Sequence, residues 1–121
     1  MLSLQAHAPA EIVSGLPEME FRQLEAFNQG HVGVFRCSAG VSPWERHPDD
    51  DELLFVLGGE VDITVMFDAG PRTTTVKPGS LFVVPKGRWH RHEVRERLEE
   101  LYVTPGPTEH SMAEDPRVEE A

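Results

Sequence analysis

The chain has 121 residues and a formal net charge of −10, from 21 acidic and 11 basic side chains. This length fits one domain, and a hydrophobic content of 39% is too high for a wholly disordered chain. The acidity argues against nucleic acid or an anionic membrane as the main partner, because binding to either requires a basic face.

Residues 1–19 are predicted to form an N-terminal extension. They lack the basic region and the long apolar region of a secretory signal. No apolar run in the chain approaches the roughly 20 residues that span a membrane. The single cysteine, Cys37, excludes an internal disulfide framework. Together these features predict a cytoplasmic protein.

Residues 20–105 are interrupted by glycine and proline at short intervals, which mark turns. Between the turns lie short apolar or alternating runs, and residues 61–67 have the period of two that indicates a half-buried strand. Residues 93–100 are charged and are predicted to form a hairpin turn. The expected strands cover residues 32–37, 52–57, 61–67, 73–76, 81–84, 89–94 and 98–104. Many short strands with regular turns predict an all-β sandwich or barrel.

Residues 106–121 are acidic and contain proline, which predicts a C-terminal tail that is ordered only where it docks. Charged residues are unevenly distributed along the chain before this tail. Residues 71–97 carry seven basic and two acidic side chains, so this segment is basic. This basic segment could favour an anion. Solvated strand faces that pair with acidic neighbours are the preferred interpretation.

Three of the six histidines stand in positions that suit metal coordination. His90 and His92 are two residues apart in a predicted strand, so their side chains share a face. His47 precedes a run of carboxylates at the start of another predicted strand. Two imidazoles and a carboxylate suit divalent iron, manganese, nickel or zinc, although strand histidines often serve packing alone. The other histidines, near the termini or in a turn, carry little weight: His7, His31 and His110.

Residues 79–90, GSLFVVPKGRWH, resemble the second motif of the cupin superfamily. That motif is a glycine, five residues, Pro-x-Gly, two residues and a histidine, and each fixed position up to His90 matches. An asparagine usually follows four residues later, where this chain has Val94. The match therefore includes the Pro-x-Gly turn and the histidine that follows it.

The first cupin motif is matched in part. Glu52 and Gly59, with six residues between them, fit its second half, and His47 matches its second histidine. Glu45 occupies the place of the first histidine. Gly40 begins the motif one residue short of the usual spacing.

The resemblance implies an all-β fold, a single double-stranded β-helix or cupin jelly-roll barrel over residues 20–105, with its ligand site inside. It implies that His47, Glu52 and His90 hold a divalent metal ion (Fe, Mn, Ni or Zn). Two candidates remain for the fourth ligand. Glu45 has the spacing of the motif, and His92 shares a face with His90.

The function implied by the resemblance is that of a small metal-dependent enzyme, of the oxygenase, isomerase or lyase type, acting on a small molecule. A non-catalytic module that binds or senses a small ligand is the alternative. Arg88 and Arg91 are candidates for gripping an anionic substrate group. We also expect a homodimer, because small cupins commonly pair by sheet extension. Residues 32–37 and 98–104 are the candidate edge strands for such pairing.

Overall fold

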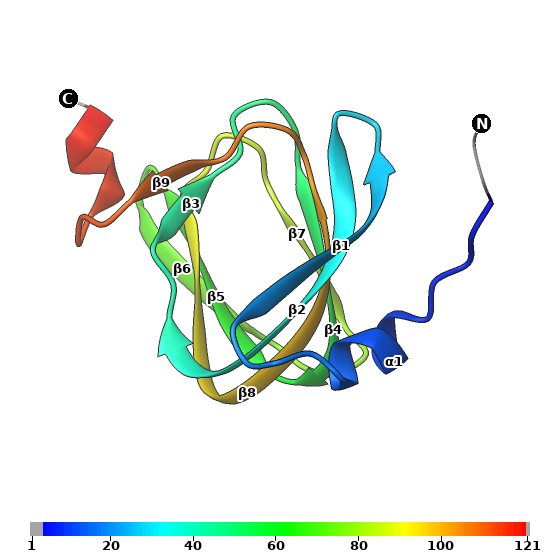
Figure 1. Ribbon diagram of the computed structural model, residues 1–121. Coiled ribbons are helices and arrows are strands. Elements are labelled where there is room, and N and C mark those ends of the chain that lie inside the picture. Colours follow the sequence, from blue (N-terminus) through cyan, green and yellow to red (C-terminus); the bar gives the residue numbers. More distant parts are fainter. Residues whose placement is uncertain (1–3, 121) are drawn as a thin grey trace.

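A computed structural model describes residues 4–120 and shows an all-β barrel with one short α-helix, which confirms the jelly-roll prediction (Figure 1). The helix, α1 (Pro9–Ser14), precedes the barrel, and a short 3-10 helix, η1 (Pro116–Glu120), follows it. The strands are β1 (Glu20–Phe27), β2 (Gly30–Val41), β3 (Trp44–Arg46), β4 (Glu52–Gly59), β5 (Val61–Phe67), β6 (Gly70–Val76), β7 (Leu81–Val84), β8 (His90–Thr104) and β9 (Glu109–Ser111).

Strand β8 organises the barrel, because it pairs antiparallel with four other strands along its length. Its first residue, His90, lies opposite Glu45 of β3 and Val65 of β5. Its later residues lie opposite β2 and β4. The remaining strands extend this arrangement, with β1 on β2, β7 on β4, β6 on β5 and β9 on β3. One strand therefore links both sides of the barrel.

The hairpin predicted for residues 93–100 is wrong, because β8 continues through them as a strand. Most of its even-numbered side chains face inward, and Val94, Leu98 and Glu100 are buried, whereas Glu96 is exposed. The charged side chains between them are largely exposed, so charge masked the period of two in the sequence. A shift in the β2 register between Ser38 and Gly40 lets the strand bend there.

The core fills the interior between the strands and leaves room for a pocket. Leu54, Val56, Ile63 and Leu98 are each at most 2% exposed. A second cluster lies where α1 covers the outer face of the sheet, with Val13, Leu16 and Val34 buried together. Apolar side chains thus hold the sheet from both faces, which stabilises the framework that carries the site.

The C-terminal segment, predicted as a tail, docks on the barrel. Strand β9 pairs with β3, which brings His110 opposite Glu45. Pro116 is fully buried, and the Arg117 guanidinium donates to the backbone carbonyls of Phe67 and Asp68. These contacts lay residues 109–111 beside the strand that precedes His47.

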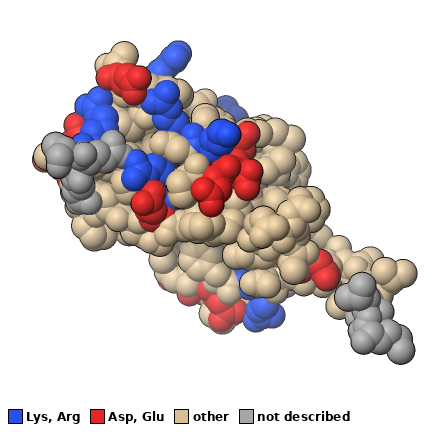
Figure 2. Space-filling model, turned by 90° about the horizontal axis from the view of Figure 1, so that it is seen from above, with Lys and Arg blue, Asp and Glu red and all other residues tan. Residues whose placement is uncertain are grey.

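The surface charges are mixed. On the face shown in Figure 2, basic and acidic side chains lie interspersed. Arg95 of the basic segment pairs with Glu60 and Asp62, and Arg88 pairs with Asp68. These pairs agree with the interpretation that the basic segment forms solvated strand faces whose charges pair with acidic neighbours. Within residues 4–120, no helix is long and apolar enough to cross a membrane.

Candidate metal centre

Three buried side chains from separate segments converge inside the barrel. His47 follows β3, Glu52 begins β4 and His90 begins β8, and these residues are 3%, 6% and 1% exposed. His47 Nε2 lies 3.2 Å from Glu52 Oε1, and His90 Nε2 lies 3.3 Å from the same oxygen. One possible ligand atom from each lies within 4.8 Å of the other two. The structure therefore brings together the three residues expected to form the core of a metal site.

The turn before β8 fixes where His90 enters the barrel. Gly87 has φ +75°, a conformation that favours glycine, and its amide donates to the His47 carbonyl over 2.8 Å. The Pro-x-Gly part of the second motif therefore connects the two histidine-bearing segments directly. This bond helps to set the position at which β8 begins.

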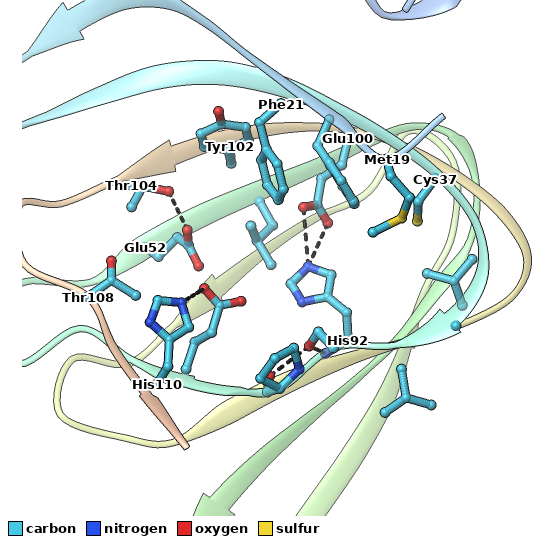
Figure 3. A pocket seen from close by; sticks show the side chains of 18 of the residues that line it. Met19, Phe21, Cys37, Glu52, His92, Glu100, Tyr102, Thr104, Thr108 and His110 are labelled. Carbon is cyan, nitrogen blue, oxygen red and sulfur yellow. Dashed lines mark hydrogen bonds and ion pairs between the residues drawn. The ribbon is translucent and has the colours of Figure 1, made fainter. Parts of the chain in front are cut away.

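Two hydroxyl groups orient the buried side chains. Thr108 Oγ1 lies 3.0 Å from His47 Nδ1, which leaves Nε2 of that ring toward Glu52. The Thr104 hydroxyl donates to Glu52 Oε2, as the dashed line in Figure 3 shows, and leaves Oε1 toward the imidazoles. Outer partners of this kind commonly fix the tautomer and direction of metal ligands.

Two buried ring nitrogens in this group, His47 Nε2 and His90 Nδ1, make no hydrogen bond of good geometry within residues 4–120, although His47 Nε2 lies 3.2 Å from Glu52 Oε1. Unpartnered buried polar atoms are costly and often mark a place for an ion or ligand. A cation shared by a carboxylate oxygen and imidazole nitrogens would satisfy such a group, so these residues fit a divalent metal ion.

The electrostatics of the group favour a cation. Burial alone would raise the pKa of Glu52, but its contacts with His47 and His90 outweigh burial and hold that pKa well below its usual range. Burial lowers the pKa of His47, while the neighbouring Glu52 carboxylate raises it by more, so the net shift is upward. Glu52 is therefore ionised at neutral pH in a place that water barely reaches.

Both candidates for the fourth ligand lie next to His90. Glu45, His90 and His92 form a second group whose nitrogen and oxygen atoms lie within 4.8 Å of one another, but neither candidate belongs to the group of His47 and Glu52. Glu45 Oε2 lies 3.5 Å from His110 Nε2. The geometry thus leaves both candidates open.

His92 is held by a partner that the sequence did not reveal. Its Nε2 lies 3.1 and 3.2 Å from the two carboxylate oxygens of Glu100, which is 3% exposed. Burial lowers the pKa of His92, but the charge of Glu100 raises it by more, to about 9. Glu100 shares the inward face of β8 with His90 and His92, and the hairpin predicted there obscured this periodicity.

A pocket of about 610 Å³ adjoins these groups. Two differently built regions line it, and Figure 3 shows Glu52, Thr108 and His110 in the first and Phe21 and Tyr102 in the second. We call the first the polar side, which consists of Glu45, His47, Glu52, Thr108 and His110. We call the second the aromatic wall, which consists of Phe21, His31, Phe35 and Tyr102.

The aromatic wall is built from three strands by ring contacts. Phe21 of β1 stacks on Phe35 of β2 with ring centroids 4.1 Å apart. Phe21 also meets Tyr102 of β8 edge-on at 5.9 Å, and Tyr102 meets His31 at 5.6 Å. Ring pairs in these arrangements stabilise one another beyond simple burial.

Sequence reasoning missed some residues of the pocket and misassigned others. Thr108 and His110 come from the segment predicted as a tail, and no local signal links them to Glu45 or His47. Arg88 and Arg91 were candidates for gripping an anionic substrate group, but neither lines the pocket. Arg88 binds Asp68, and the Arg91 guanidinium lies 4.7 Å from the centre of the Trp44 ring.

A family model described as a cupin domain matches residues 35–104. An uncharacterized protein of Streptomyces coelicolor is 36% identical over 77 residues, which cover 63% of this chain and 70% of that protein. An uncharacterized protein of Bacillus subtilis is 36% identical over 81 residues, which cover 67% of this chain and 65% of that protein.

Two solved structures illustrate the shared fold. A cupin-2 domain protein from Shewanella frigidimarina has a TM-score of 0.65 at 22% identity, covering 78% of this chain and 88% of its own. A hydroquinone 1,2-dioxygenase, solved in complex with Cd²⁺ and 4-hydroxybenzonitrile, has a TM-score of 0.64 at 19% identity, covering 88% of this chain and 81% of its own. At such identities the likeness concerns the fold alone.

Proposed function

This chain belongs to the cupin family, and from that premise we propose that it is a small metal-dependent enzyme acting on a small molecule inside its barrel. The observation that carries the proposal is the buried group of His47, Glu52 and His90, whose possible ligand atoms lie within 4.8 Å of one another. The neighbouring pocket supplies space for a substrate. The reaction type is an oxygenase, isomerase or lyase step.

The proposed ligands are His47, Glu52 and His90, with Glu45 in the fourth position. His92 remains the alternative, but its Nε2 is already engaged by Glu100. A mixed set of imidazole and carboxylate donors suits Fe, Mn, Ni or Zn in the divalent state. When bound, such an ion supplies a Lewis acid, and iron or manganese also supplies redox chemistry.

The chain's own residues would prepare this centre before a substrate arrives. Thr108 holds the ring of His47, and Thr104 holds the carboxylate of Glu52. Preorganisation of this kind reduces the reordering needed during a reaction. The pocket beside the centre allows one face of the site to receive a ligand.

Metal analysis tests the proposal most directly. The purified chain is supplemented with Fe, Mn, Ni or Zn, passed through a desalting column and assayed by elemental analysis. We expect about one equivalent in the native chain and less than about a tenth in His90→Ala. The matched control is His7→Ala, which removes another histidine that contacts a carboxylate, Glu25, outside the site. Metal retention in His90→Ala, or less than a tenth of an equivalent in the native chain, contradicts the proposal.

The fourth ligand is tested by the same assay on two variants. Loss of metal affinity in Glu45→Ala, with retention in His92→Ala, supports Glu45. The opposite result assigns the position to His92. Both variants alter the group around His90, so circular dichroism checks that each folds.

A ligand-binding module without catalysis is the second candidate function. It is favoured by the carboxylate of Glu45 in the place of the motif's first histidine, since this changes the donor set. An oxygen-uptake screen of the metal-loaded chain with catechols, thiols and 1,3-dicarbonyls tests the oxygenase branch. Ligand binding without turnover of any screened compound class favours the binding module.

A second copy of the chain is the protein partner that we propose, but not through the edges expected from the sequence. Those runs lie in β2 and β8, which have strand neighbours on both sides. Within residues 4–120, β7 pairs only with β4. It carries Leu81 and Val83, which are 60% and 46% exposed. Pairing along this edge predicts a dimer by light scattering that Val83→Lys converts to a monomer.

A further inference from the structure

The C-terminal segment contacts the pocket with one of its faces and the outer surface with the other. Thr108 and His110 both line the pocket, and Figure 3 shows them together near Glu52. Glu109, which stands between them, does not line the pocket and instead binds Arg46 at 2.9 Å. Alternate side chains of an extended segment point to opposite sides, so the two pocket residues share the inward face.

Each residue of this inward face contacts one of the proposed metal ligands. Thr108 Oγ1 lies 3.0 Å from His47 Nδ1, and His110 Nε2 lies 3.5 Å from Glu45 Oε2. The pairing of β9 with β3 sets these contacts, because it places His110 directly opposite Glu45. The position of the C-terminal segment therefore decides how two of the proposed ligands are held.

The remainder of the segment is anchored on the outside of the barrel. Trp44 Nε1 donates to the Glu114 carbonyl over 3.3 Å, and the Arg117 guanidinium donates to two backbone carbonyls at the end of β5. Pro116 is fully buried, but none of these four residues lines the pocket. Figure 1 shows this part of the chain, in orange to red, running past β3 to the outer side. We call residues 108–117 the strap.

The strap is held by few backbone contacts compared with the strands around it. Strand β9 has three residues and, within residues 4–120, pairs only with β3. Strand β2, by contrast, pairs with β8 from His31 to Val41. Segments held by few contacts open locally at a lower free energy than the whole fold. The strap is therefore the part of the site that can leave while the barrel stays folded.

We propose that docking of the strap and binding of a metal ion are coupled, with Thr108 and His110 as the positioning residues that link them. The docked strap holds His47 and Glu45 in place for the ion, and the bound ion holds the strap docked. This coupling rests on the proposed metal centre. Linkage is reciprocal, so docking should tighten metal binding by the same factor by which metal stabilises docking. A change at the outer anchor should then weaken metal binding without touching the site.

The first experiment lifts the strap at its outer anchor. Pro116→Asp places a charge at a buried position, while the matched control, Val118→Asp, places it at a residue that is 67% exposed. The only two tryptophans, Trp44 and Trp89, are buried in one cluster, so their fluorescence reports docking. We expect emission to shift to longer wavelength in Pro116→Asp and to stay unchanged in Val118→Asp. Circular dichroism checks that the barrel is retained.

Metal affinity is measured on the same variants by competition between Zn²⁺ and a chelator. We expect Pro116→Asp to bind Zn²⁺ about 10–100-fold more weakly than the native chain, because partners that orient metal ligands typically contribute that much. Val118→Asp should bind as the native chain does. A shifted tryptophan emission together with native Zn²⁺ affinity in Pro116→Asp overturns the coupling.

A double-variant background separates positioning from general loss of stability. Where Thr108→Val and His110→Ala have already removed the inward contacts, adding Pro116→Asp should cost little further Zn²⁺ affinity, because the route from the anchor to the site is gone. A loss as large as in the native background shows that Pro116→Asp acts by another route and overturns the role of the two residues.

Hydrogen exchange tests the reverse direction in the native chain, without any substitution. Saturating Zn²⁺ should slow amide exchange in residues 109–111 by about the factor lost in Pro116→Asp. The control is β1, which within residues 4–120 pairs only with β2 and carries no proposed ligand, and its amides should not respond. Unchanged exchange in residues 109–111, or an equal response in β1, overturns the coupling.

The imidazole of His47 gives a readout that needs no metal. In NMR spectra of the metal-free chain at fixed pH, the ring signals of His47 in Pro116→Asp should move toward those in Thr108→Val, while Val118→Asp keeps the native signals. If the native chain binds no Zn²⁺, the proposed function fails, but these spectra still show whether the strap positions the ring. Native His47 signals in Pro116→Asp, with the tryptophan emission shifted, overturn the positioning role.

Discussion

The polar side and the aromatic wall belong to one pocket but are held in different ways. On the polar side, His47 and Glu52 are buried and are fixed by hydrogen bonds, His47 by Thr108 and Glu52 by Thr104. The aromatic wall includes Phe21, which stays mostly exposed and is held by ring contacts alone. Substitutions on the polar side should therefore remove whole networks, while those on the wall should remove single contacts.

The largest expected effect follows from removing the charge at the centre of the polar side. Glu52→Ala leaves the imidazoles of His47 and His90 buried without their shared carboxylate. We expect the free energy of unfolding of the metal-free chain to fall by about 3–5 kcal/mol, measured by chemical denaturation. Glu60→Ala removes a half-exposed partner of Arg95 and should cost less than about 1 kcal/mol. Equal losses in the two variants would show that the buried group does not stabilise the fold.

The contribution of His92 to stability can be isolated by measuring the free energy of unfolding as a function of pH. The pKa of His92 rises from 6.5 to about 9 on folding, so the folded state binds its proton more tightly than the unfolded state. The resulting stability is fully present below pH 6.5 and is lost as the pH rises through about 9, by about 3 kcal/mol. The difference in unfolding free energy between the native chain and His92→Gln should shrink over this range. Glu100 faces His92 directly, and Glu52 and Glu45 add to its field. If the difference in unfolding free energy between the native chain and His92→Gln does not change with pH, the raised pKa of His92 is falsified.

The hydroxyl that orients His47 should have a smaller effect, expressed in metal affinity. Thr108→Val removes the partner of His47 Nδ1, and we expect affinity to fall about 10–100-fold in a competition titration with a chelator. Thr73→Val is the control, because Thr73 makes an exposed hydroxyl contact with Thr64. Unchanged affinity in Thr108→Val would mean that packing alone orients the imidazole.

The smallest effect is expected on the aromatic wall. Phe21→Ala should leave metal stoichiometry unchanged and lower the free energy of unfolding by less than about 1 kcal/mol, because the ring is 64% exposed. The same denaturation and metal assays check this. A tenfold loss of metal affinity would show that the two regions of the pocket are coupled rather than independent.

Much of the fold was predictable because it depends on local patterns. Alternating residues predicted β5, and glycine and proline marked the turns, including Gly87 with its positive φ. The resemblance to the cupin motifs placed His47, Glu52 and His90 in one expected group, and the structure brings these three together. Where charge hid the alternation, in residues 93–100, the prediction failed, and Glu100 was lost with it.

The sequence by itself determined the barrel and three central residues of its candidate metal site, because motif spacing and strand period are properties of neighbouring residues. Only the tertiary structure decided what surrounds them. Thr108 reaches His47 across 61 positions in the chain, through the pairing of β9 with β3. Phe21 and Tyr102 meet because β1 and β8 both flank β2. Such contacts depend on which strands become neighbours, and the free energy that selects those neighbours comes from the whole core rather than from any one segment.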